Sequence, residues 1–157
     1  MLPLAHIGLT VATFALLRKK GLFRGINYKK VALAAILPDL IDKPLAIFVF
    51  PQSRSALLFS HTLLLHLAAW LGVAFKKWQN LPYALAFSGH LLLDRIWDFP
   101  QTLFFPFKGW NFHRWRDVGS PRAFGRAYFE VIGEHPELLV GEIAGLLALI
   151  WFFREKP

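Results

Sequence analysis

The chain has 157 residues, a formal net charge of +8, 55% hydrophobic residues and no cysteine. Charged residues make up 18% of it, against about a quarter in soluble domains, which argues against an ordinary soluble protein and indicates a membrane protein with one domain, residues 1–157. The lack of cysteine excludes disulfides, thiolate nucleophiles and cysteine-ligated zinc. The basic residues cluster between apolar segments and no nucleic-acid-binding motif occurs, so we expect contact with membrane lipids and not with nucleic acid.

Five apolar segments follow one another along the chain, each near the length of about 20 residues that crosses a bilayer as a helix. The first lacks a small-residue cleavage site near its end, so we expect it to be a retained helix. The predicted fold is all-α: an integral membrane helical bundle with about five membrane-embedded helices. The five segments are residues 2–17, 31–50, 56–75, 81–105 and 136–153.

The connections between these segments carry the topological signal. "RKKGLFRGINYKK" joins the first two segments and "KKWQN" joins the third and fourth, and both are basic. Basic loops tend to stay on the cytoplasmic side. We therefore expect a multi-pass protein whose N-terminus faces away from the cytoplasm.

The longest connection, residues 106–135, mixes Trp, Phe and Tyr with Arg and His. Aromatic rings and cations together favour the membrane interface, where rings enter hydrocarbon and cations meet headgroups. Two interpretations stay open for this interfacial connection: a simple anchor, or a lid that recognises headgroups above an active site. It separates the predicted core, residues 1–105, from a C-terminal helix, residues 136–153.

Six ionisable residues fall inside the apolar segments. Such residues cost several kcal/mol each at membrane depth unless they are paired, hydrated or bound to metal, so they indicate function by default. In an alternating up-and-down topology all six lie in the same half of the membrane, on four different helices. They are His6, Asp39, Asp42, His61, His90 and Asp94.

The spacing of these residues favours a metal site. Asp39 and Asp42 are three positions apart and His90 and Asp94 are four apart, so each pair shares one helix face. Helix bundles build metal sites from carboxylates and imidazoles on facing helices. Imidazole with carboxylate suits zinc, manganese or iron better than calcium. His66 lies about 140° around its helix from His61 and is left out of the predicted site.

Each of these residues also has an explanation without function. His6 could lie at the interface, and His61 could be a packed core histidine. Asp39 could cap the helix that continues after Pro38, and Asp42 could pair with Lys43 or Arg54. Asp98 could support Asp94 or pair with Arg95, while His113 and His135 are expected in solvent or at the interface. That six residues should reach one layer by accident is the weaker explanation.

Three stretches resemble a known family. "ILPDLIDKP", "RSALLFSHTLL" and "GHLLLDRIWDFPQTLFFPFKGW", preceded by a histidine, resemble the YdjM-type family of membrane-bound, metal-dependent hydrolases, from His6 to about Trp110. The resemblance implies an integral protein of the inner (cytoplasmic) membrane, distantly similar to zinc-dependent phospholipase C and P1 nuclease, which cleave phosphoesters. It implies as metal ligands the same six residues, His6, Asp39, Asp42, His61, His90 and Asp94.

The chain departs from the family pattern at one position. Many relatives carry a further histidine five residues before the one that matches His61, and Ala56 stands there in this sequence. The departure predicts a site with fewer metal ions. Arg54, two residues earlier, could instead supply a planar fork for phosphate or carboxylate.

The favoured hypothesis is metal-assisted hydrolysis of an amphiphilic phosphoester, such as a phospholipid or a lipid-linked phosphate. Zinc is the expected cofactor, with manganese or iron as alternatives, and Asp39 and Asp94 are the candidate catalytic bases. A protein that translocates protons or cations is an alternative, because intramembrane His and Asp also form such pathways. A non-catalytic adaptor stabilised by metal is another. The predicted substrate-binding residues are Arg54, Arg95, Arg114 and Arg116.

Overall fold

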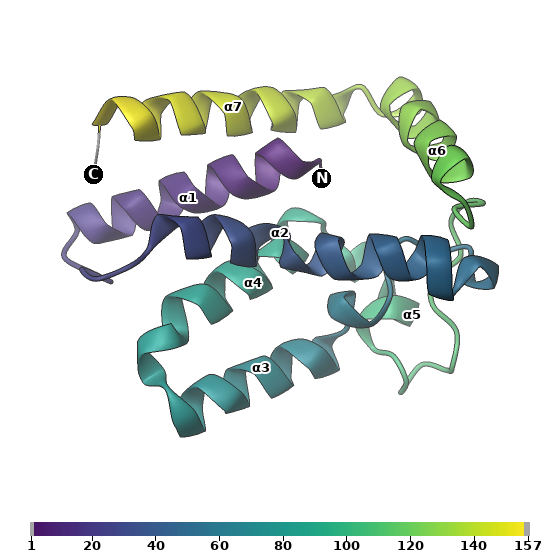
Figure 1. Cartoon of the computed structure of the whole chain (residues 1–157), viewed down its shortest axis with the longest axis horizontal. Helices are drawn as coiled ribbons and strands as arrows, with labels where there is room; N and C mark the ends of the chain where they lie inside the picture. The colour runs from purple at the N-terminus through teal and green to yellow at the C-terminus, as the bar shows by residue number, and fades with distance from the viewer. Residues whose placement is uncertain (1, 156–157) are drawn as a thin grey trace.

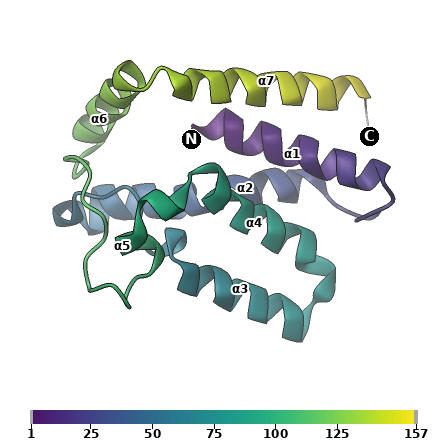
Figure 2. The same cartoon turned by 180° about the vertical axis from the view of Figure 1, so that it is seen from behind.

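The computed structural model describes residues 2–155 and, within them, an all-α chain without strands, as predicted. Seven α-helices and five short 3₁₀ or π-helical turns follow one another in this part of the chain. The longer helices lie in layers (Figures 1 and 2): α7 beside α1, then α2, then α4 and α3. The α-helices are α1 (Pro3–Lys19), α2 (Tyr28–Pro44), α3 (Leu63–Lys76), α4 (Leu81–Leu93), α5 (Pro100–Leu103), α6 (Pro121–Glu134) and α7 (Glu137–Glu155).

Helices α1 and α7 run side by side in the same direction (Figure 1). At one end the carboxylate of Glu142 accepts hydrogen bonds from the backbone N–H groups of Leu4 and Ala5, which have no partner inside α1. At the other end Lys19 pairs with Glu155. Between these contacts two glycines, Gly8 and Gly145, let the backbones meet: a Cβ on Gly8 would lie 1.9 Å from the carbonyl oxygen of Gly145.

The buried core joins α1, α2 and α4. Helix α2 begins at Asn27, whose side-chain oxygen caps the N–H groups of Lys29 and Lys30. Partly buried apolar side chains, mainly from the same three helices, surround the core. The residues at its centre are Val11, Phe14, Val31, Ala34, Ala86 and Phe87.

Several predicted helices are shorter or more broken than expected. The second segment continues past α2 only as a π-helical turn, η1 (Leu45–Val49), and the third begins with a 3₁₀ turn, η3 (Phe59–His61), before α3. The fourth ends as α4 at Leu93, and Arg95 follows in a left-handed conformation with φ 52°. Polar residues and prolines interrupt the helical hydrogen bonds at these points.

One helix was not predicted. Residues 106–135 were expected to be an interfacial connection, with no helix assigned to them, and α6 occupies the last part of this connection. The signal for this helix is local: Ser120 caps the N–H of Ala123, and Pro121 stands at the first helical position.

The predicted membrane crossings are not supported by helix length. Among residues 2–155 no individual helix combines the length and the apolar character that a bilayer crossing requires. The bent pair α6 and α7, whose axes meet at 97°, meets that requirement only when the two helices are taken together. Five membrane-embedded helices and an outside N-terminus therefore stay predictions.

Two helices present apolar side chains to the exterior. Helix α3 exposes 56% of Leu71 and 83% of Phe75, and α7 exposes 67% of Val140 and 68% of Phe153. Exposed apolar surface on this scale is a mark of membrane or protein contact. The exterior of the bundle therefore suits a lipid environment even though its helices are short.

Candidate metal centre

Four side chains from three elements converge inside the bundle. Asp39 comes from α2, His61 from η3, His90 from α4 and Asp94 from the C-terminal cap of α4, and one ligand atom from each lies within 4.8 Å of all the others. The Nε2 atoms of His90 and His61 lie 3.1 and 3.5 Å from Oδ2 of Asp94. Oδ1 of Asp39 lies 3.8 Å from each of these nitrogens. This arrangement is able to bind a divalent metal ion.

Hydrogen bonds behind the two imidazoles determine which nitrogen faces the site. Nδ1 of His61 lies 2.7 Å from Oδ2 of Asp42, and Nδ1 of His90 lies 2.7 Å from the carbonyl oxygen of Ala35. Both of these oxygens can only accept, so each Nδ1 donates and each Nε2 of a neutral ring carries a lone pair. The two Nε2 atoms are 3.2 Å apart. Two lone pairs and two carboxylates thus face one volume, which suits a cation.

Asp42 lies behind His61 and outside the group of four. Its side chain is fully buried, and its oxygens accept hydrogen bonds from the N–H groups of Leu58 at 2.6 Å and Ser60 at 3.0 Å as well as from His61. These three hydrogen bonds orient the 3₁₀ turn η3 and the imidazole of His61. It does not pair with Lys43 or Arg54, the alternatives that the sequence left open; Lys43 pairs with Asp39 instead, with Nζ 2.6 Å from Oδ2.

His6, from α1, contacts Asp94 and His90, whereas Asp42 contacts His61. The ring of His6 is fully buried, stacks on the ring of His90 with centroids 3.9 Å apart, and brings Nε2 to 3.0 Å from Oδ1 of Asp94. Its Nδ1 is a buried nitrogen without a hydrogen-bond partner in the described part of the chain. His6 is thus no interfacial histidine: α1 brings it against the same carboxylate that faces His61 and His90.

A second layer of hydrogen bonds holds the turn that carries His61. His66, which the sequence places on another face, donates or accepts at both ring nitrogens: Nε2 lies 3.0 Å from the carbonyl oxygen of Ser60, and Nδ1 lies 3.0 Å from Oγ of Ser88. Ser60 in turn donates its hydroxyl to the carbonyl oxygen of Pro38, 2.7 Å away. His66 is therefore a structural histidine that ties α3 to α4 and η3.

A cavity of about 330 Å³ opens onto the centre. Asp39 and Asp94 line it together with Lys43, and Ala56 is part of the same wall. The rest of the wall is largely apolar and comes from Leu2, from the chain before η3, from residues 99–116 and from α6 and α7. The apolar side chains lining it are Leu2, Leu57, Phe99, Trp115, Phe124, Val131 and Leu138.

Helix α6 supplies a polar group as well. The phenol of Tyr128 lines the cavity. Partial burial raises its pKa above the ordinary value, and the negative charges of Glu142 and Asp39 raise it further. Its hydroxyl therefore stays protonated at neutral pH and is available as a hydrogen-bond donor.

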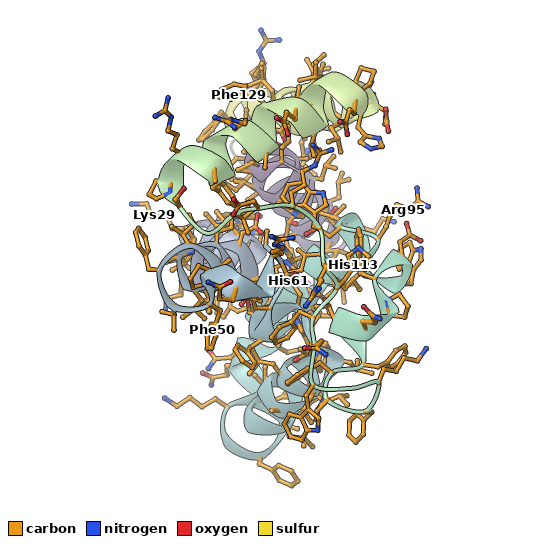
Figure 3. All side chains as sticks on the ribbon, turned by 90° about the vertical axis from the view of Figure 1, so that its right-hand side faces the viewer. Lys29, Phe50, His61, Arg95, His113 and Phe129 are labelled. Atoms are coloured by element: carbon orange, nitrogen blue, oxygen red, sulfur yellow. The ribbon has the colours of Figure 1, made fainter. Side chains whose placement is uncertain are left out.

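The four arginines predicted to bind substrate do not gather at the cavity. Arg116 lines it, but its guanidinium is held by the carboxylates of Glu130 and Glu134. Arg54 contributes its carbonyl oxygen to a hydrogen bond with the N–H of Trp115 and is absent from the cavity wall. Arg95 is 70% exposed, pairs with Asp98, and points outward at the edge of the molecule (Figure 3). Arg114 lines a separate hollow.

Sequence reasoning missed Lys43, Tyr128 and His113 as cavity residues. Lys43 follows Asp39 by one helical turn, a spacing that favours an ion pair and could have been recognised. His113 was assigned to solvent or interface, yet it lines the cavity and packs against Phe99. No local pattern predicts that the segment around His113 folds back over the site.

Comparison with known proteins adds one finding. The family model described as YdjM inner membrane protein matches residues 1–154. The chain belongs to this family. Membership indicates a membrane protein of the inner membrane, which agrees with the apolar exterior of α3 and α7. No curated protein and no solved structure matches the chain.

Replacing Asp42 by asparagine is expected to weaken metal binding by about 10- to 100-fold, because partners that orient a metal-bound imidazole have effects of this size. The amide keeps the shape but loses one acceptor oxygen. The matched control is Asp98→Asn, which changes an exposed carboxylate that pairs with Arg95. Competition with a chelator of known affinity measures both variants. Equal affinities would show that Asp42 does not act on His61.

Proposed function

We propose that this protein is a membrane-bound, metal-dependent hydrolase that acts on a phosphoester of a lipid or another amphiphilic substrate. One observation carries the proposal: two imidazole nitrogens and two carboxylate oxygens lie within 4.8 Å of one another, and the two carboxylates line a largely apolar cavity. Such a cluster is costly without a cation. Zinc fits the mixed nitrogen and oxygen ligands, and manganese or iron are the alternatives.

Each residue has a defined part in this proposal. The ligands are Nε2 of His61, Nε2 of His90, and the carboxylates of Asp39 and Asp94. His6 and Asp42, which the family resemblance also suggests as ligands, support Asp94 and His61 through hydrogen bonds at 3.0 and 2.7 Å. A divalent ion held there supplies Lewis acidity, which activates water and stabilises negative charge on a phosphoryl oxygen.

Proton transfer falls to a carboxylate of the same group. Asp39 and Asp94 both line the cavity, so either can reach a water molecule that enters it. Asp94 is surrounded by three imidazoles, whereas Asp39 faces two of them at 3.8 Å. We therefore assign the role of general base to Asp39 and expect Asp94 to be the more tightly held metal ligand.

The walls of the cavity indicate the kind of substrate. The cavity is lined by apolar side chains of α6 and α7 and by Phe99 and Trp115, together with the charged groups of Asp39, Lys43 and Asp94. A molecule with a phosphoester at one end and an apolar portion at the other matches this distribution. Membrane lipids are the source of such molecules for an inner-membrane protein.

The test is turnover by the full chain purified in detergent. Protein stripped with a chelator and resupplied with zinc or manganese is expected to hydrolyse a chromogenic phosphodiester that carries an alkyl chain. Asp39→Asn is expected to reduce turnover by at least about 100-fold in protein saturated with metal, because it removes the candidate base and weakens one of the four ligands. Metal binding without any turnover would contradict the hydrolase and favour a metal-stabilised adaptor. Metal-dependent ion flux in proteoliposomes without turnover would favour a cation pathway.

A further inference from the structure

Lys43 lies beside Asp39 and lines the cavity together with Asp39 and Asp94. It lies one turn after Asp39 on α2, and its Nζ contacts Oδ2 of Asp39 at 2.6 Å. The other oxygen of that carboxylate, Oδ1, faces the imidazoles of His61 and His90. The ammonium group is therefore on the cavity side of the candidate ligand Asp39, and its side chain is 24% exposed.

No other cation lining this cavity is placed in the same way within the described residues. Arg116 is held by two carboxylates on α6, and His135 lies beside Glu137, with Nδ1 2.8 Å from Oε1. Among residues 2–155, Lys43 has one hydrogen-bond partner, Asp39, for its three N–H donors. Two donors thus stay available to a molecule that enters the cavity.

An ammonium group at this place suits an anionic substrate. A phosphoryl group that meets two carboxylates would be repelled unless positive charge offsets them, and charge-assisted hydrogen bonds to phosphoryl oxygens are among the strong ones. The four arginines expected to do this do not offer a free guanidinium to the cavity. Lys43 can donate a hydrogen bond to a phosphoryl oxygen while it keeps its contact with Asp39.

We propose that Lys43 is a substrate-contacting residue whose ammonium binds a phosphoryl oxygen beside Asp39. This inference rests on the proposed metal-dependent function and names the residue that selects an anionic group. Asp39 holds the lysine side chain across the cavity wall, so that the donor is in place before substrate enters. The free anion and the headgroup of an amphiphile share this chemistry, and the test below separates them.

The experiment measures phosphate binding to the zinc-loaded full chain in detergent, by calorimetry, with metal content determined on the same samples. Lys43→Met is expected to retain wild-type zinc and to bind inorganic phosphate at least about tenfold more weakly, because one charge-assisted hydrogen bond is lost. Lys43→Arg is expected to recover part of the affinity. The control is Lys19→Met, which also breaks a lysine–carboxylate pair, at the far end of α1.

The outcomes are separable. Unchanged phosphate affinity in Lys43→Met overturns the inference and leaves the proposed metal site intact. A loss of zinc in that variant also overturns the inference, because it would mean that Lys43 only supports Asp39. A wild-type protein that binds no zinc overturns the proposed function itself. If hexyl phosphate binds more tightly than inorganic phosphate, and Lys43→Met weakens the binding of both to the same extent, the ligand is an amphiphile. Equal affinities for the two compounds identify the free anion as the ligand.

Discussion

Replacing His90 by alanine is expected to remove stoichiometric metal from the purified protein. Its metal affinity should fall by more than the roughly 10- to 100-fold expected for residues such as Asp42, which only hydrogen-bond to a ligand. His90 Nε2 lies at the centre of the group, 3.2 Å from Nε2 of His61 and 3.1 Å from Oδ2 of Asp94. Its loss leaves one imidazole and two carboxylates. Elemental analysis of detergent-purified protein measures the effect, and Asp94→Ala is expected to behave in the same way.

His66→Ala is the matched control for His90→Ala. Both histidines are buried and both use each ring nitrogen, but His66 bonds to Ser60 and Ser88 and not to the group of four. This variant is expected to lose stability and keep its metal. Circular dichroism and membrane extraction confirm that each variant is folded and inserted. Metal that persists in His90→Ala, or that is absent from the wild type after reconstitution, would contradict the metal centre.

Replacing Gly8 by alanine is expected to lower the free energy of unfolding by about 3 kcal/mol, at the upper end of the usual cost of overpacking. The new Cβ would lie 1.9 Å from the carbonyl oxygen of Gly145, and 2.7 Å from its Cα, so the two helix backbones must separate. Separation also pulls the N–H groups of Leu4 and Ala5 away from Glu142. Thermal unfolding in detergent measures the change.

The control is Gly72→Ala in α3, where a Cβ would meet nothing within 4 Å. Alanine favours a helix over glycine by about 0.5–1 kcal/mol, so this variant is expected to be as stable as the wild type or slightly more stable. Because His6 lies two residues before Gly8, Gly8→Ala is also expected to weaken metal binding. A Gly8→Ala protein with unchanged stability and metal affinity would show that α7 does not position α1.

Local spacing predicted part of the site correctly. The four-residue interval between His90 and Asp94 places both on one face of α4, and their side chains meet at 3.1 Å. The all-α class was also predictable, because apolar runs with caps and without alternation specify helices. Counting residues along the segments predicted that four elements meet, and α1, α2, η3 and the end of α4 contact one another at the site. Their common depth in a membrane stays a prediction.

Contacts between elements were not predictable in the same way. Asp39 and Asp42 share a helix face but contact different nitrogens. Asp39 faces Nε2 of both His61 and His90, whereas Asp42 accepts a hydrogen bond from Nδ1 of His61. The difference arises because His61 lies in a 3₁₀ turn and not inside a helix. The turn exists because backbone N–H groups of Leu58 and Ser60 bond to Asp42. Such bonds join residues 16 and 18 positions apart, beyond the reach of a local pattern.

The sequence by itself determined the helical class, the family, and the presence of histidines and carboxylates at matching depths in an apolar chain. Only the tertiary structure decided that Asp42 hydrogen-bonds to His61, that Lys43 forms an ion pair with Asp39, and that α6 lines the cavity beside Asp39. Side chains three or four positions apart share a helix face, so local spacing in the sequence predicts which residues lie on one face. The partner of a buried side chain depends instead on how helices cross, which close contacts such as Gly8 with Gly145 decide.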